Sequence, residues 1–189
     1  MIKKIIGFCE TLLITFFVVS MVFTFCFATY TIDGESMEST LSRGDTVLVS
    51  KIHLSVKQGD IVIARTDKSV TLDDSGEITS KKVVEKLIVK RVIAAEGQTI
   101  DFDFGRGKVY VDGNELREEY ASGLTHLDEG AFTGKYPVKV PEGYVFVMGD
   151  NRRNSLDSRS SELGFVSVKD IEGEVIWRMA PYERFGKLD

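Results

Sequence analysis

An uncharged apolar run dominates the N-terminal part of the sequence. No charged side chain occurs from Thr11 to Tyr30, and the run extends back to Ile5 with Glu10 as its one acidic residue. Residues 5–30 would form a helix of about 39 Å at 1.5 Å per residue. That length exceeds the roughly 30 Å hydrocarbon core of a bilayer, so the pattern predicts a tilted transmembrane anchor over residues 5–30.

A cleaved secretory signal is the alternative for the same run. Such signals have an apolar core of about 7–15 residues, and the sequence CFA before Thr29 is a poor cleavage site. We therefore favour a retained anchor. Because Lys3 and Lys4 precede the run, the positive-inside rule places residues 1–4 in the cytoplasm and residues 31–189 outside it, as a domain anchored to the cell membrane by a single pass.

Short runs of β-branched and aromatic residues, bounded by turn signals such as Gly-Asp, follow the anchor. The expected strands lie within 45–51, 59–65, 83–97, 108–116, 143–151 and 171–179, with a hairpin turn at Asp112-Gly113. The polar stretch 66–82 is predicted to be an exposed loop, and 121–141 an irregular surface excursion. No second helix is indicated. The pattern therefore predicts an all-β fold, an antiparallel sandwich or barrel-like domain with one N-terminal transmembrane α-helix.

Composition excludes several functions for this domain. The chain has 24 basic and 29 acidic side chains, and only Lys3, Lys4 and Glu10 lie in the first 30 residues, which leaves 22 and 28 downstream. An acidic domain does not provide the basic face that nucleic acid needs. Both cysteines fall in the apolar run, and His53 and His126 belong to no H-E-x-x-H pattern, so a disulfide framework and a zinc hydrolase are disfavoured. A metal site made of carboxylates alone stays open.

The stretch GESMESTL places Ser36 directly after the anchor. For an isolated serine a polar exit loop is the favoured explanation, and this stretch is not the G-x-S-x-G elbow of many serine hydrolases. Ser36 is therefore only a candidate nucleophile on this stretch alone.

The stretch KLIVKRVIAAEG places Lys90 in a strand whose two faces are both largely apolar. A lysine there must snorkel, pair or lose its proton, and a desolvated neutral amine can act as a general base. Lys86 and Arg91 have similar positions, so a snorkelling surface lysine stays an open alternative.

The stretch MGDNRRNSLDSR is a dense polar run after an apolar strand. It can be a solvated loop, or it can hold hydrogen-bonding groups that orient a lysine amine, among them Asp150, Asn151, Ser155, Asp157 and Arg159. Together the three stretches offer a nucleophile, a base and an orienting loop without histidine. A Ser-Lys dyad is the economical interpretation.

These elements, in this order, resemble the boxes of bacterial type I signal peptidases, which belong to the serine-lysine peptidase family S26. The resemblance rests on GESMESTL, GDTVLVSK, VKRVIAAEGQTI and GDNRRNSLDSR followed by GFV, and the single span and compact length are similar to the Gram-positive branch. It implies a membrane-bound serine endopeptidase that removes signal peptides from exported preproteins. Its implied partners are those preproteins, membrane lipid and the secretion translocon, with no cofactor and no metal.

The resemblance also implies roles for individual residues. Ser36 would be the nucleophile and Lys90 the general base, with Ser155 orienting the Lys90 amine. The remaining implied residues are Asp150, Asp157 and Arg159 as stabilising groups, Gly34 beside the Ser36 amide as the second oxyanion donor, and Ile32, Ile88 and Val89 in shallow apolar pockets for small substrate side chains.

Ser39 is a departure from the family pattern. It stands where the family usually has proline, which fixes φ, so its presence predicts a looser turn after the nucleophile.

Two other functions remain open from the sequence. A non-catalytic, membrane-tethered β-domain that binds exported proteins or peptidoglycan would explain the anchor and the acidic domain, but not the serine, the lysine and the polar loop together. A specialised processing peptidase for one dedicated exported substrate would carry the same residues.

Overall fold

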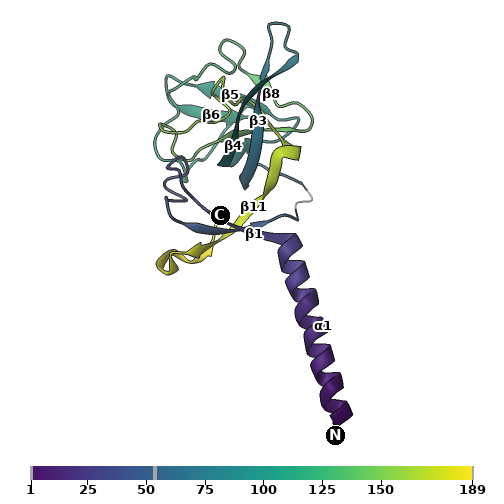
Figure 1. Cartoon of the computed structure of the whole chain (residues 1–189). Helices are drawn as coiled ribbons and strands as arrows, with labels where there is room; N and C mark the ends of the chain where they lie inside the picture. The colour runs from purple at the N-terminus through teal and green to yellow at the C-terminus, as the bar shows by residue number, and fades with distance from the viewer. Residues whose placement is uncertain (1, 53–54, 189) are drawn as a thin grey trace.

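The computed structural model describes residues 2–52 and 55–188, so Met1, His53, Leu54 and Asp189 lie outside the described residues. A long N-terminal helix, α1 (Ile2–Cys26), leads directly into a domain built from strands and the loops between them (Figure 1). Its strand pairings are antiparallel. The predicted fold class, an all-β domain with one N-terminal helix, is confirmed.

The helix α1 projects away from the domain (Figure 1). Its phenylalanines are open to the surroundings, with Phe16 72% and Phe17 68% exposed, and an 18-residue stretch within Lys3–Cys26 has a mean hydropathy of 2.2. By length and composition this helix can cross a membrane. It ends at Cys26, four residues before Tyr30, because the next residues form β1 (Phe27–Thr31), whose backbone pairs with β2 (Thr46–Ser50).

A large sheet forms most of the domain. Its strand order is β1, β2, β11 (Ile171–Ala180), β3 (Ile61–Leu72), β4 (Ile78–Ala94), β9 (Tyr144–Met148) and β10 (Val166–Ser167), with β12 (Gly186–Lys187) paired to β11. A second sheet has the order β7 (Asn114–Glu115), β6 (Lys108–Val111), β5 (Thr99–Asp103) and β8 (Val138–Lys139). Two short 3-10 helices, η1 (Val168–Asp170) and η2 (Tyr182–Arg184), flank β11.

The predicted loop at 66–82 is wrong. Strands β3 and β4 stay paired as far as Leu72 and Ile78, and the chain reverses only at Asp73–Glu77, where the Asp73 carboxylate accepts the Ser75 and Glu77 N–H groups. The ribbon projects beyond the rest of the domain (Figure 1). Residues 78–82 of β4 are exposed, and β3 buries the polar Thr66 and Ser69 beside Val70, so the sequence lacks the apolar alternation that marks a half-buried strand.

Two other local predictions are confirmed. Asp112 and Gly113 form the turn between β6 and β7 with φ values of 51° and 77°, the left-handed conformation that a two-residue hairpin turn requires. The excursion 121–141 is irregular apart from β8, and it meets the domain through bridges such as Gly130 with Ser160.

Buried apolar residues form the cores that hold the site. One cluster contains Ile93, Ile100, Phe132, Phe146 and Phe165, with residues of both sheets. A second cluster contains Ile32, Met37, Leu41, Val47, Val49, Ile61, Ile63 and Val175. Because this second cluster includes residues on both sides of Ser36, the segment that carries the serine is anchored by apolar packing.

Candidate active site

Ser36 lies on a compact turn after β1, which we call the serine turn (residues 35–41). The N–H groups of Thr40 and Leu41 donate to the carbonyl of Met37 at 3.0 and 2.7 Å. Met37 and Leu41 are fully buried, whereas Ser36 is half-buried. Two apolar side chains therefore fix the turn in the core, and the serine that precedes them stays partly accessible.

Lys90 lies in the buried half of β4, where every residue from Lys90 to Ala94 is buried. Its Nζ lies 2.7 Å from Ser36 Oγ and 3.0 Å from the carbonyl of Val89. Burial lowers the pKa of the Lys90 amine from 10.5 to about 8, because desolvation penalises its charged form, and the negative charges of Asp157 and Asp150 only partly oppose this. A large fraction of the amine is thus neutral in mildly alkaline solution.

Asp150 is fully buried and forms a bidentate ion pair with Arg91, the residue after Lys90. The Arg91 Nε and NH2 groups donate to the two carboxylate oxygens at 3.0 and 2.9 Å, and Thr40 Oγ1 donates to the same carboxylate at 2.5 Å. Asp150 therefore ties β4 to the serine turn. Its negative charge lies near Lys90 but is largely compensated by the Arg91 guanidinium.

Asp157 pairs with Arg159, and both side chains are fully buried. The Arg159 Nε and NH2 groups donate to Asp157 at 2.9 and 2.8 Å, and the N–H of Gly149 donates to the same carboxylate at 3.1 Å. A buried carboxylate with these donors is held in one orientation. The pair fixes the loop that begins at Gly149.

Gly149 is the point where Ser36 and Ser155 approach each other. A Cβ on Gly149 would lie 2.3 Å from Ser155 Oγ and 2.4 Å from the carbonyl oxygen of Ser36, so only glycine fits there. In the described part of the chain, the buried Ser155 Oγ has no hydrogen-bond partner, and Lys90 bonds to Ser36 and Val89 instead. The role of Ser155 in orienting Lys90 stays a prediction.

A cavity of about 190 Å³ opens beside Ser36 and Lys90. Two segments form most of its lining, one from the end of β1 into the serine turn and one from β4, and β3 adds a single residue. The residues are Tyr30, Thr31, Ile32, Asp33, Gly34, Ser36, Ile63, Leu87, Ile88, Val89 and Lys90. The three residues predicted for substrate pockets therefore lie together, and Gly34 lies on the same wall. Their contacts with a substrate stay a prediction.

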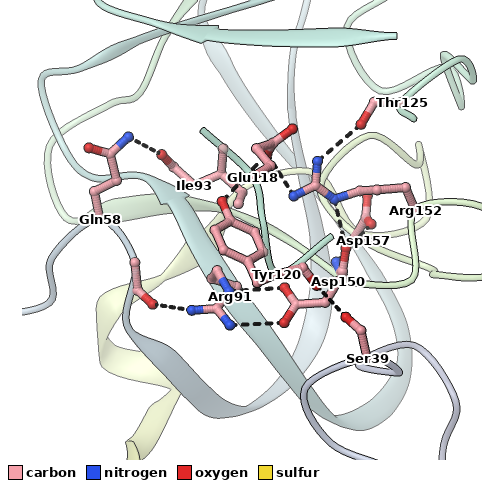
Figure 2. Close-up of polar contacts among 12 residues, drawn as sticks. Ser39, Gln58, Arg91, Ile93, Glu118, Tyr120, Thr125, Asp150, Arg152 and Asp157 are labelled. Atoms are coloured by element: carbon pink, nitrogen blue, oxygen red, sulfur yellow. Dashed lines mark hydrogen bonds and ion pairs between the residues drawn. The ribbon is translucent and has the colours of Figure 1, made fainter. Parts of the chain in front are cut away.

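The sequence interpretation missed a group of polar residues around Asp150, several of which are drawn in Figure 2. The sequence analysis gives Arg91 no role beyond its place next to Lys90, and it predicts none for Thr40, Tyr120 or Arg152. Arg152 is buried, and it bonds to Thr125 at 3.0 Å and to the carbonyl of Gly149 at 2.9 Å. The sequence held a signal for this group, namely Arg91 in a buried strand and the basic pair after Gly-Asp-Asn. Buried charges need partners, so these residues indicate buried ion pairs nearby.

The described residues were compared with the side-chain groupings that hold metal ions in proteins. Over residues 2–52 and 55–188, no group of three or more His, Cys, Asp or Glu side chains is placed to hold a metal ion. The carboxylates near Lys90 are already paired with arginines.

Comparison with known proteins identifies the family. The family model described as signal peptidase, peptidase S26, matches residues 5–180. The chain belongs to this signal peptidase family. All predicted site residues, from Ile32 to Arg159, fall inside the matched range.

Relatives within the signal peptidase family cover most of the chain. Signal peptidase I P of Bacillus subtilis subsp. natto is 35% identical over 178 residues, 90% of this chain and 86% of the relative. Probable signal peptidase I-1 of Synechocystis is 36% identical, over 83% of this chain and 73% of the relative. A crystal structure of a signal peptidase I from Enterococcus faecalis V583 covers 64% of this chain and 97% of its own, with 24% identity and a TM-score of 0.44. Membership of this serine peptidase family makes the chain a hydrolase.

Proposed function

We propose that this protein is a membrane-anchored signal peptidase in which Ser36 is the nucleophile and Lys90 the general base. The observation that carries the proposal is the 2.7 Å separation of Lys90 Nζ and Ser36 Oγ, with the lysine buried and its pKa lowered to about 8. A general base must reach the proton that it accepts, and its pKa must lie near the working pH. Lys90 meets both conditions.

The substrate is an exported preprotein whose cleavage segment binds as an extended strand. The cavity lies between the segment that ends β1 and the segment Leu87–Lys90 of β4, and backbone groups on these segments suit strand addition. Small side chains one and three residues before the scissile bond fit against Ile32, Ile88 and Val89. The cavity of about 190 Å³ has room for such side chains, and the aliphatic residues Ile32, Ile88 and Val89 give it apolar walls.

Neutral Lys90 accepts the Ser36 proton as Oγ attacks the scissile carbonyl carbon. The tetrahedral intermediate collapses to an ester on Ser36, and the Lys90 ammonium returns the proton to the leaving amine. Neutral Lys90 then activates a water molecule, whose attack releases the signal peptide. The Ser36 N–H, which has no hydrogen-bond partner in the described residues, is one donor to the oxyanion, and the Gly34 N–H is the second.

The helix α1 holds this site at the membrane surface where signal peptides emerge. No linker separates α1 from β1, so the dyad cannot move far from the bilayer. The anchor thereby raises the effective concentration of membrane-bound substrate. With Lys3 and Lys4 in the cytoplasm, the domain faces outward, where lipid and the secretion translocon are its neighbours. Protease added outside spheroplasts tests this orientation, because it should digest the domain without lysis.

Cleavage of a signal-bearing preprotein by the full chain in detergent or lipid vesicles tests the dyad. Ser36→Ala and Lys90→Ala should abolish cleavage, while Lys86→Ala, a lysine on the same strand that pairs with Glu162, should leave it intact. Cleavage at the wild-type rate by either dyad variant would sink the proposal. Equal loss in the Lys86 variant would show a general effect on the strand.

A further inference from the structure

Tyr120 contacts two parts of the dyad's support at once (Figure 2). Its backbone carbonyl accepts a hydrogen bond from the Ser39 hydroxyl, on the serine turn. Its ring lies over the guanidinium of Arg91, with 4.0 Å between Arg91 Cζ and the ring centroid. One residue from the irregular stretch after β7 therefore joins the segment that carries the nucleophile to the strand that carries the base.

The serine turn has a conformation that needs such support. Ser39 has a φ of 92°, a left-handed conformation that side chains other than glycine rarely adopt. Holding a non-glycine residue there costs on the order of 1–3 kcal/mol and persists only where neighbouring groups determine it. Proline cannot adopt this φ at all. The turn after Ser36 therefore differs in conformation from one with proline at position 39, and is not simply a looser form of it. The bond to the Tyr120 carbonyl is one contact that determines it.

Arg91 connects the other side of Tyr120 to the dyad. It follows Lys90 directly in β4 and is 2% exposed, and besides Asp150 it donates to the carbonyl of Gly59 at 2.9 Å and to Thr40 Oγ1 at 3.3 Å. The Tyr120 ring covers the guanidinium and contributes a cation–π attraction, which is stronger where water is excluded. A displacement of Arg91 would thus move both Lys90 and the serine turn.

Tyr120 is itself held in place by residues close to it in the chain. The N–H of Ser122 donates to the carbonyl of Asp150 at 2.7 Å, and Glu118 forms an ion pair with the buried Arg152 at 2.7 Å. The N–H of Asn151, next to Asp150, donates to the carbonyl of Ser36 at 2.9 Å. The same loop therefore positions Tyr120 and Ser36.

We propose that Tyr120 is a positioning residue that fixes Ser36 relative to Lys90, its carbonyl restraining the serine turn and its ring restraining Arg91. This inference rests on the Ser36–Lys90 chemistry proposed above. Neither Tyr120 nor Ser39 lines the cavity beside the dyad, so neither is placed to contact the bound cleavage segment. Their loss should therefore reduce kcat and leave KM unchanged.

Steady-state cleavage of a preprotein by full-length variants tests the proposal. Tyr120→Leu removes the ring and Ser39→Ala removes the hydroxyl, and each should lower kcat about 10- to 100-fold, because small misplacements of reacting groups are costly. Tyr120→Phe keeps the ring and should restore activity. Tyr182→Leu is the matched control, since this tyrosine is 87% exposed and remote from the described contacts of the dyad.

Thermal unfolding of each variant separates positioning from folding. Because Ser39 is exposed, Ser39→Ala is expected to fold. This variant therefore still tests the proposal if Tyr120→Leu unfolds. Unchanged kcat in folded Ser39→Ala and Tyr120→Leu, or a rise in KM with constant kcat, would overturn the proposal. Ser36→Ala, assayed in parallel, distinguishes failure of the proposed dyad from failure of the positioning role. Cleavage by Ser36→Ala would contradict the dyad itself. Fully active Tyr120 and Ser39 variants beside an inactive Ser36→Ala would contradict only the positioning role.

Discussion

Lys90 Nζ lies 2.7 Å from Ser36 Oγ, although 54 residues separate them in the chain. Three strands, β2, β11 and β3, lie between β1 and β4 in the order of the large sheet. The segment after β1 and residues Leu87–Lys90 of β4 nevertheless line the same cavity, so the sheet curves until its first and fifth strands approach each other. The dyad is a product of this curvature.

The buried lysine predicts an alkaline pH dependence. Below about pH 8 Lys90 is mostly protonated and cannot accept the Ser36 proton, so kcat/KM should rise as the pH increases through about 8 and then level off. A pH–rate profile of preprotein cleavage measures this limb. Lys90→Arg should be inactive throughout, because a guanidinium stays charged. A midpoint near 10.4, the ordinary lysine pKa, would contradict the effect of burial.

Breaking the buried ion pair behind the dyad should destabilise the protein. Asp150→Asn leaves the Arg91 guanidinium buried without its counter-charge, which typically costs about 3–5 kcal/mol of unfolding free energy. Urea unfolding in detergent measures the change. Asp33→Asn is the matched control, because that carboxylate is 89% exposed in its pair with Arg43 and should change stability by no more than about 1 kcal/mol. Equal stability of the two variants would show that the Arg91 pair is dispensable.

A side chain at Gly149 should disturb both stability and catalysis. The added methyl of Gly149→Ala meets the backbone carbonyl of Ser36, which cannot move without displacing the serine turn. We expect a lower melting temperature and a lower kcat. Gly186→Ala adds the same methyl where no atom lies within 4 Å, and should match the parent in both measurements. A Gly149→Ala enzyme with parental kcat would contradict the close approach.

Filling the cavity should alter substrate choice. Val89→Phe places a ring in a space of about 190 Å³, so kcat/KM should fall about tenfold or more for a preprotein with alanine one and three residues before the cut. A substrate with glycine at those positions should lose less. Val84→Phe makes the same change on β4 outside the cavity lining, where Val84 is 80% exposed, and should have no effect. Equal losses for both substrates would argue against a size-selective pocket.

The sequence predicted those parts of the fold whose local pattern has one physical explanation. The uncharged N-terminal run predicted a long helix, and Asp112-Gly113 predicted a hairpin turn, because each depends on neighbours in the chain. The ribbon at 66–82 escaped prediction. Its strands are held by backbone pairing with each other and, at Val70, with Leu163 and Phe165, and their mostly polar side chains carry no apolar period.

The site was predictable to a similar extent. Ser36 and Lys90 stood out through the resemblance to a peptidase family, and burial of Lys90 followed from apolar residues on both sides of it in the strand. The support by Tyr120 could not be predicted, because it comes from an irregular segment and acts partly through a backbone carbonyl, which every residue possesses.

The sequence by itself thus determined the membrane-length helix, the strand-rich domain and the residue types available for chemistry. Only the tertiary structure decided which of these groups meet. The distance from Lys90 to Ser36, the partners of Asp150 and the φ of Ser39 depend on sheet curvature and on contacts between segments far apart in the chain. Residue pattern encodes burial and local conformation, whereas a separation of 2.7 Å is set by the packing of the whole domain.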